Sequence, residues 1–104
     1  MKVPLNVVER LSLLNSVPAK GTMRDMKVVQ ALRKKVGFTD IEMQKFGISQ
    51  VGEQISWFPE ANRDVDIDFT VEEAGVVVKR LKELDTLGEI KDEHITIWDK
   101  FVQE

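Results

Sequence analysis

The stretch Asp64-Val65-Asp66-Ile67-Asp68-Phe69, followed directly by Thr70-Val71-Glu72-Glu73, decides the fold. Acidic and apolar residues alternate in its first six positions, and alternate side chains of an extended strand point to opposite faces. The sequence therefore predicts a β-strand with three aspartates facing solvent and three apolar side chains facing the core. Thr70 and Glu73 have the spacing of a capping box, which predicts that a helix begins immediately after the strand.

The same aspartates have a second interpretation, as metal ligands. Asp64, Asp66 and Asp68 match the first three ligand positions of an EF-hand calcium loop. That loop needs glycine at its sixth position and a bidentate glutamate at its twelfth, where this chain has Phe69 and Gly75. We therefore predict neither a metal site nor a bound cofactor, and we interpret the aspartates as charges that keep an edge strand from pairing with another chain.

The predicted partner of this strand is the β-forming stretch of residues 54–58, joined to it by a loop at residues 59–63. A lone two-stranded hairpin is marginal in water, so we expect one of its faces to pack on helices. Trp57 and Phe58 are adjacent, so one of them points inward and the other outward. The outward aromatic is either a protein-contact residue or is covered by a neighbouring loop or helix.

Helical spacing and capping signals predict five helices: residues 4–15 with Pro4 in the first turn, 22–36, 39–46, 70–85, and a last helix from Asp92 almost to the C-terminus. Gly37 and Gly47 are expected to end the second and third helices in the left-handed conformation. In the last three helices, the residues expected to face the core are Ile41, Phe46, Val71, Ala74, Val78, Leu81, Ile95, Trp98, Phe101 and Val102. The corresponding apolar positions of the first two helices are Val8, Leu11, Leu14, Met26, Val29, Leu32 and Val36. The predicted fold is one mainly helical α+β domain, residues 1–104, with a two-stranded antiparallel β-hairpin packed on the helices.

Composition predicts an ordinary globular protein, because 42% of the 104 residues are hydrophobic and 32% are charged. The chain has no cysteine and no apolar run long enough to cross a bilayer, so we expect a cytoplasmic protein without membrane association. The net charge of −3 is unevenly distributed. Residues 1–47 hold nine Lys or Arg against four Asp or Glu, whereas residues 48–104 hold six against fourteen. This asymmetry is neutralised internally, steers a partner or drives head-to-tail association of copies of the chain.

Catalysis is not predicted, and no catalytic residue is assigned. His94 is the only histidine, and its helical neighbours at i+4 and i+7 are Trp98 and Phe101, which favours a packing role near a helix start. The six glycines are dispersed, so they form no phosphate-binding loop, and no small-molecule ligand is indicated.

Nucleic-acid binding is the alternative function, because three helices followed by a hairpin is the order of a winged helix. A basic second helix would supply the phosphate contacts through Arg24, Lys27, Lys34 and Lys35. However, the third helix carries Asp40 and Glu42, and the presumed wing carries Glu60 and the three aspartates, all of which repel a duplex. Nucleic acid is therefore the less favoured partner.

Several segments together resemble small uncharacterised proteins encoded by phages and prophages. They include Glu9-Arg10-Leu11, Lys27-Val28-Val29, Gln54-Ile55-Ser56-Trp57, the acidic β segment, and the closing Asp92-Glu93-His94 helix. Phe58 departs from this pattern, which has a polar residue there. The resemblance implies no catalytic residue and a location in the host cytoplasm.

With the composition, this resemblance favours a non-enzymatic protein-interaction module of accessory or regulatory type that forms homodimers or binds another protein. The candidate contact residues are Trp57, Phe58, Asp64, Asp66 and Asp68.

Overall fold

The computed structural model describes residues 1–102 and places five α-helices, one short 3₁₀-helix and four β-strands within them. In chain order they are β1 Lys2–Leu5, α1 Val7–Ser16, α2 Met23–Val36, α3 Asp40–Phe46, β2 Ser49–Val51, β3 Gln54–Ser56, η1 Pro59–Ala61, β4 Val65–Asp68, α4 Val71–Thr86 and α5 Asp92–Phe101. Part of the predicted C-terminal helical pattern falls on residues 103–104, which lie outside the described residues.

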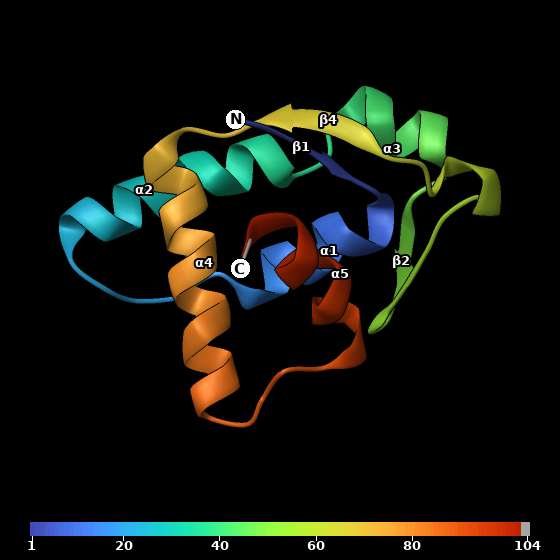
Figure 1. Cartoon of the computed structure of the whole chain (residues 1–104). Coiled ribbons are helices and arrows are strands. Elements are labelled where there is room, and N and C mark those ends of the chain that lie inside the picture. Colours follow the sequence, from blue (N-terminus) through green and yellow to red (C-terminus); the bar gives the residue numbers. More distant parts are fainter. Residues whose placement is uncertain (103–104) are drawn as a thin grey trace.

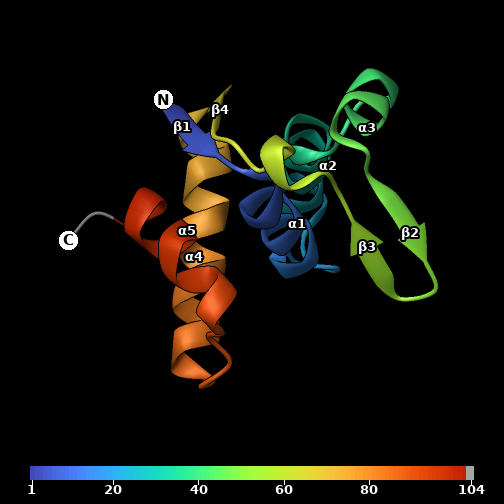
Figure 2. The ribbon, with the colours of Figure 1, turned by 90° about the vertical axis from the view of Figure 1, so that its right-hand side faces the viewer.

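The fold class is confirmed, since the chain is a mainly helical α+β protein with two-stranded antiparallel pairing. The predicted strand partners are wrong. The acidic strand β4 pairs with the N-terminal strand β1, and β3 pairs with β2 in a separate sheet (Figures 1 and 2). The protein therefore contains two small sheets, one formed by distant segments and one formed by a local hairpin.

The strand β1 replaces the predicted first turn of a helix at Pro4. Pro4 lies opposite Asp66 in the β1–β4 pair, and α1 begins only after Asn6. The Asn6 side chain accepts a hydrogen bond from the Glu9 backbone N–H, and the Glu9 carboxylate accepts one from the Asn6 N–H. This capping box, rather than the proline, sets the start of the helix.

The register of β1 and β4 determines which backbone groups face outward. The Met1 amino group donates to the Phe69 carbonyl at 2.9 Å, and the Phe69 N–H donates to the Met1 carbonyl at 2.8 Å. Hydrogen-bonded and non-bonded pairs alternate in an antiparallel ladder. The next bonded pairs are therefore Val3 with Ile67 and Leu5 with Val65. Pro4 and Asp66, which lie between them, turn their backbone groups to the two outer edges of the sheet.

The side chains of β4 follow the predicted alternation. Asp64, Asp66 and Asp68 are exposed, whereas burial on the other face increases along the strand, from exposed Val65 through half-buried Ile67 to buried Phe69. Phe69 packs edge-to-face on Phe101, with ring centroids 5.3 Å apart. The strand thus joins the main core at its C-terminal end.

The main core lies between the β1–β4 sheet and the four longer helices. In Figure 1, α4 crosses in front of α2, while α1 and α5 lie side by side below the sheet. Buried side chains from all of these elements form one cluster: Val3, Leu5, Leu13, Val17, Val29, Leu32, Val36, Phe69, Ala74, Val77, Leu81, Ile97, Phe101 and Val102. The predicted inward positions of Ala74, Leu81, Phe101 and Val102 are confirmed, and Val78 and Trp98 are half-buried against the cluster.

Three other predicted core positions are wrong. Ile41 is 77% exposed, Val71 is 87% exposed and Ile95 is 52% exposed. Ile97 and Val77, one or two positions along the helix from the expected residues, are buried instead. α3 has no buried residue at all. The buried stripes of α4 and α5 keep some of the predicted positions and replace the others by neighbouring ones.

The glycines predicted to end α2 and α3, Gly37 and Gly47, differ in backbone conformation. Gly47 has the predicted left-handed conformation, with φ of 64°. Gly37 does not, since its φ is −64°. Glycine is required there for space, because a Cβ at this position would lie 2.8 Å from the Arg33 carbonyl oxygen.

Residues 37–64, which we call the outer lobe, contribute no buried residue. They comprise α3, β2, β3 and η1, and none of their side chains belongs to the main core cluster. Figure 2 shows the β2–β3 hairpin extending away from the helices at the end of this lobe. The fold therefore consists of a packed body and an exposed extension.

Candidate protein-contact site

The outer lobe is anchored to the body by the buried side chain of Arg10, on α1. Its Nε donates to the Val36 carbonyl at 2.9 Å and its Nη2 donates to the Gly37 carbonyl at 2.8 Å. These two bonds supply donors to carbonyl groups at the C-terminal end of α2. The guanidinium also forms a two-pronged ion pair with Glu42, at 2.9 and 3.2 Å. The central carbon of the guanidinium, Cζ, lies 4.0 Å from the centroid of the Phe38 ring. One arginine thus contacts the last residue of α2 and three residues at the start of the outer lobe.

Glu42 has two structural roles in this anchor. Its carboxylate pairs with Arg10 and also accepts the Thr39 N–H in the predicted capping box of α3. The hydrogen bond from Arg10 lowers the pKa of Glu42 below its usual value, despite partial burial. The carboxylate is therefore ionised in the folded protein at neutral pH, and it carries the ion pair.

Aromatic packing extends the anchor toward the hairpin. Phe38 and Phe46 meet edge-to-face with centroids 6.4 Å apart, and the Phe58 N–H donates to the Phe46 carbonyl at 2.8 Å. The Phe58 ring lies over Gly47 so closely that a Cβ there would be 2.6 Å from the ring. Gly47 is thus needed both for its positive φ and for this contact.

The hairpin beyond this anchor is exposed along its whole length. All residues of β2 and β3 are exposed, and the two strands contact chiefly each other. Their six residues, Ser49, Gln50, Val51, Gln54, Ile55 and Ser56, carry no charge. Gly52 has φ of 62° at the first central position of the two-residue turn, as type II′ geometry requires. The hairpin is well formed locally but has no core of its own.

Large apolar side chains are exposed around the hairpin. The set comprises Ile41, Met43, Val51, Ile55 and Phe58, together with Val65 at the start of β4. Phe58 is 50% exposed, whereas Trp57 is half-buried. Phe58 and Val65 line a hollow of about 430 Å³ together with Phe46 and several charged residues. Phe58 is therefore the outward aromatic of the predicted pair.

The β1–β4 sheet differs because its outer edges are blocked. On β1, Pro4 has no N–H, and its carbonyl accepts a hydrogen bond from the Lys100 ammonium at 2.8 Å. The same ammonium pairs with the buried carboxylate of Glu9 at 2.7 Å. Burial would raise the pKa of Glu9, but the hydrogen bonds from Lys100 and the Asn6 N–H outweigh it and lower the pKa. This edge therefore offers no donor at its centre and no free acceptor.

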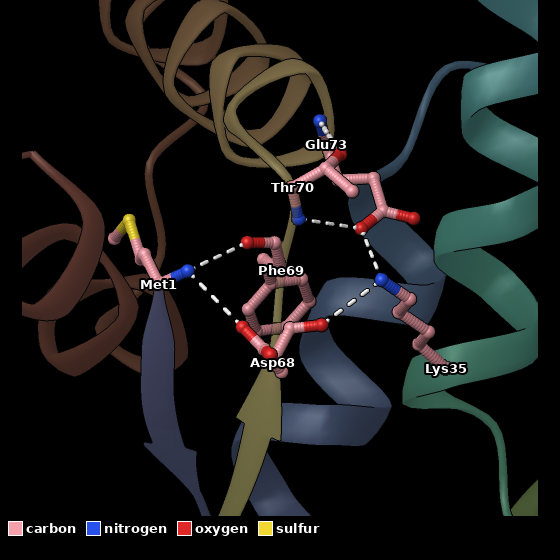
Figure 3. A network of polar contacts seen from close by, with 6 residues as sticks. All are labelled: Met1, Lys35, Asp68, Phe69, Thr70 and Glu73. Carbon is pink, nitrogen blue, oxygen red and sulfur yellow. Dashed lines mark hydrogen bonds and ion pairs between the residues drawn. The ribbon is translucent and has the colours of Figure 1, made fainter.

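A second polar network covers the C-terminal end of β4 (Figure 3). The Lys35 ammonium donates to the Asp68 carbonyl at 2.9 Å and to the Glu73 carboxylate at 2.6 Å. Burial would raise the pKa of Glu73, but Lys35 and the capping N–H of Thr70 lower it. The Met1 amino group pairs with the Asp68 carboxylate at 3.1 Å and lowers its pKa.

The structure gives the three candidate aspartates different surroundings. Asp68 contacts the Met1 amino group, Asp64 lies 3.6 Å from Lys100, and Asp66 lies at the outer edge of β4. Within residues 1–102, the structure brings together no group of three or more potential metal-ligating side chains. Asp64 and Asp68 thus take part in internal ion pairs, while Asp66 places a charge on an edge.

The four basic residues that could contact a nucleic acid differ in whether they are engaged within the protein. Arg24, Lys27 and Lys34 are exposed on α2. Lys35 instead contacts β4 and α4 through the network described above. One of the four predicted phosphate-contacting residues, Lys35, is therefore engaged in contacts within the fold.

His94 is buried at the start of α5, and it has a polar partner that the sequence did not indicate. Its Nδ1 accepts the Lys91 backbone N–H at 2.9 Å, so the neutral ring carries its hydrogen on Nε2. Nε2 lies 2.8 Å from the Ser16 Oγ, which itself donates to the Ser12 carbonyl at 2.7 Å. The histidine donates to the serine and does not accept its proton, so the pair lacks the arrangement of a nucleophile and its base. α5 begins at Asp92, as predicted, and Lys91 occupies its N-cap position.

Comparisons with known proteins add no assignment, because no protein-family model, curated protein or solved structure matches the chain. In the part of the chain that the structure describes, no helix has the length and apolar character to cross a membrane. The site is therefore interpreted from its own geometry.

Proposed function

We propose that the protein is a non-enzymatic protein-interaction module and that its contact element is the β2–β3 hairpin of the outer lobe. The observation that carries this proposal is the exposure of every residue of both strands, which are uncharged and have open edges. An exposed strand edge presents unpaired N–H and C=O groups, which pair readily with a further strand.

Stability arguments support this role. A two-stranded hairpin is marginally stable in water unless a third strand or a helix covers it. This hairpin receives neither from the body, yet it has a well-formed turn and a hydrogen bond between the Ser49 and Ser56 hydroxyls at 3.0 Å. A partner strand would supply the missing packing.

The surrounding apolar side chains support the same function. Met43, Ile55 and Phe58 are exposed close to the hairpin in sequence, and Phe58 and Val65 line a hollow that a partner side chain could occupy. Exposed apolar groups that line a hollow provide a place where a partner side chain can be buried. The lobe thus offers backbone pairing and side-chain burial together.

Two matched substitutions test the proposal. Val51→Lys places a charge on the hairpin, and Val71→Lys places the same charge on α4, where the valine is similarly exposed, at 87% against 79%. Proteins captured from the source organism by the unmodified chain are identified, purified and tested again for binding. We expect at least one to bind the unmodified chain and Val71→Lys but not Val51→Lys. Equal binding to both variants, or no reproducible partner, would contradict the proposal.

A further inference from the structure

We infer that the strand accepted by the hairpin is β2 of a second copy of this chain. The two β2 strands would pair antiparallel about a two-fold axis, with Gln50 opposite Gln50 of the second copy, in a four-stranded sheet. This inference rests on the proposed function and adds the identity of the partner.

The register of the hairpin places suitable backbone groups on the outer edge of β2. The turn has two residues, so Val51 and Gln54 form the bonded pair beside it, and Gln50 and Ile55 form the next, non-bonded pair. The N–H and C=O of Gln50 therefore point away from β3. Among the described residues, neither group has a hydrogen-bond partner, since only the Gln50 side chain is engaged, with the Gly52 carbonyl.

A residue with both backbone groups directed outward at the centre of a strand is self-complementary. Two copies related by a two-fold axis exchange the N–H of each Gln50 with the C=O of the other, and Ser49 then lies opposite Val51. Figure 2 shows β2 as the outer strand of the hairpin, so this edge is open to a second molecule. A closed dimer results, without the open-ended growth of a head-to-tail contact.

Residue chemistry distinguishes this edge from the edges of the β1–β4 sheet. Self-pairing of β4 about Asp66 would place two aspartates directly opposite each other, which is destabilising. Self-pairing of β1 about Pro4 would lack the central donor. Across β2 the paired residues are all neutral, and the antiparallel arrangement puts the two Glu53 residues, at the hairpin tips, at opposite ends of the sheet. β3 is neutral as well, and Ile55 turns its backbone groups away from β2, but β3 lies on the side of the hairpin nearer the helices and β2 on the outer side (Figure 2).

Reciprocity is the second argument for a copy of the same chain. Each hairpin lacks a third strand, and each supplies what the other lacks, so one contact stabilises both. Gln50 and Ile55 are neighbours across the hairpin, so one face of the dimer sheet carries the row Ile55, Gln50, Gln50 and Ile55. The two glutamine side chains can then exchange amide hydrogen bonds at the centre of the interface.

Sedimentation velocity of the full chain, from micromolar concentration to about 1 mM, tests the inference with a charge exchange at the two-fold axis. We expect a concentration-dependent dimer that Gln50→Lys or Gln50→Glu each weakens about fivefold, because like charges then lie opposite each other. An equimolar mixture of the two variants should restore the dimer. Gln54→Lys is the matched control, since this residue lies on the other strand and should leave the dimer unchanged.

A monomer at every concentration would overturn the inference, as would a dimer that Gln50→Lys does not weaken or that the mixture does not restore. These failures differ from failure of the proposed function. If an unrelated protein still bound the unmodified chain and Val71→Lys but not Val51→Lys, the hairpin would remain a contact element with a different partner.

Discussion

The two small sheets of this protein have the same number of strands and opposite relations to the rest of the molecule. β1 and β4 come from distant parts of the chain, pack on the main core and have edges blocked by Pro4, Lys100 and Lys35. β2 and β3 are neighbours in sequence, lie outside the core and have neutral, open edges. Strand pairing alone therefore does not determine what a sheet does in this fold.

The difference lies in which residues surround each sheet. Two ammonium groups from the helices, those of Lys35 and Lys100, donate to carbonyls of the β1–β4 sheet. Each ammonium is also paired with a buried carboxylate, that of Glu73 or Glu9. Among the described residues, the hairpin strands take part in no ion pair, and the outer lobe is joined to the body by the Arg10 anchor, by the Val8 N–H bond to Asn62 and by the Lys100–Asp64 pair. We interpret the first sheet as structural and the second as available for contact.

The largest expected effect comes from truncating one side chain in each sheet. Leu5→Ala should lower the free energy of unfolding by about 3 kcal/mol, because Leu5 is fully buried in the core. Val51→Ala should change it by less than about 0.5 kcal/mol in dilute protein, because this valine is 79% exposed. Urea unfolding at micromolar concentration measures both. Similar losses for the two variants would show that the hairpin is part of the cooperative core.

The second effect concerns the anchor. Arg10→Met should lower the free energy of unfolding by about 2 kcal/mol, because it leaves the carbonyls of Val36 and Gly37 and the Glu42 carboxylate without their donor. NMR spectra should show larger changes in residues 37–64 than in β1 and β4. Arg24→Met, at an exposed position on α2, is the control and should alter neither quantity. Changes confined to the body would contradict the assignment of Arg10 as the lobe anchor.

Acidification should act on both regions. Glu9, Glu42 and Glu73 each have a pKa below the usual value of 4.5, so their contribution to stability is present above pH 4.5 and is lost as pH falls through the lower folded values. The thermal midpoint should be nearly constant from about pH 7 to about pH 5.5 and should fall below about pH 4.5. Glu9→Gln should reduce this pH dependence. A midpoint that rises on acidification would contradict the ion-pair geometry.

The smallest expected effect comes from unblocking an edge. Lys35→Met removes the hydrogen bond to the Asp68 carbonyl and the ion pair with Glu73, and it should lower the free energy of unfolding by about 1 kcal/mol. Lys34→Met, at the neighbouring exposed position, should have almost no effect. Chemical denaturation compares the two variants. Equal effects would mean that Lys35 is an ordinary surface charge.

Local signals were sufficient to predict part of this structure. The capping boxes at Thr39 and Thr70, the left-handed Gly47 and the solvent-facing aspartates all depend on residues within one turn or one strand, and all are present. The partner of β4 could not be predicted, because its paired residues in β1 lie 60 to 66 positions away in the chain and include a proline that is also typical of a first helical turn.

The candidate site depended even more on contacts between distant segments. Phe58 is exposed, as expected of one of the two adjacent aromatics. The open hairpin next to it was not predicted, because the sequence signals pair residues 54–58 with the acidic strand, whereas the structure pairs β3 with β2. Arg10 carries no local signal, because its partners lie at the junction of α2 and α3. Buried arginines of this kind become recognisable only once the helices are placed.

Amide hydrogen exchange followed residue by residue in NMR tests the contrast between the two sheets most directly. We expect slow exchange of the Val3 and Ile67 amides at every protein concentration, because both are bonded within the β1–β4 ladder. We expect fast exchange of the Gln50 amide in dilute protein and slower exchange as the concentration rises and the β2 edge becomes paired. A Gln50 amide as protected as that of Val3 in dilute protein would contradict the open edge.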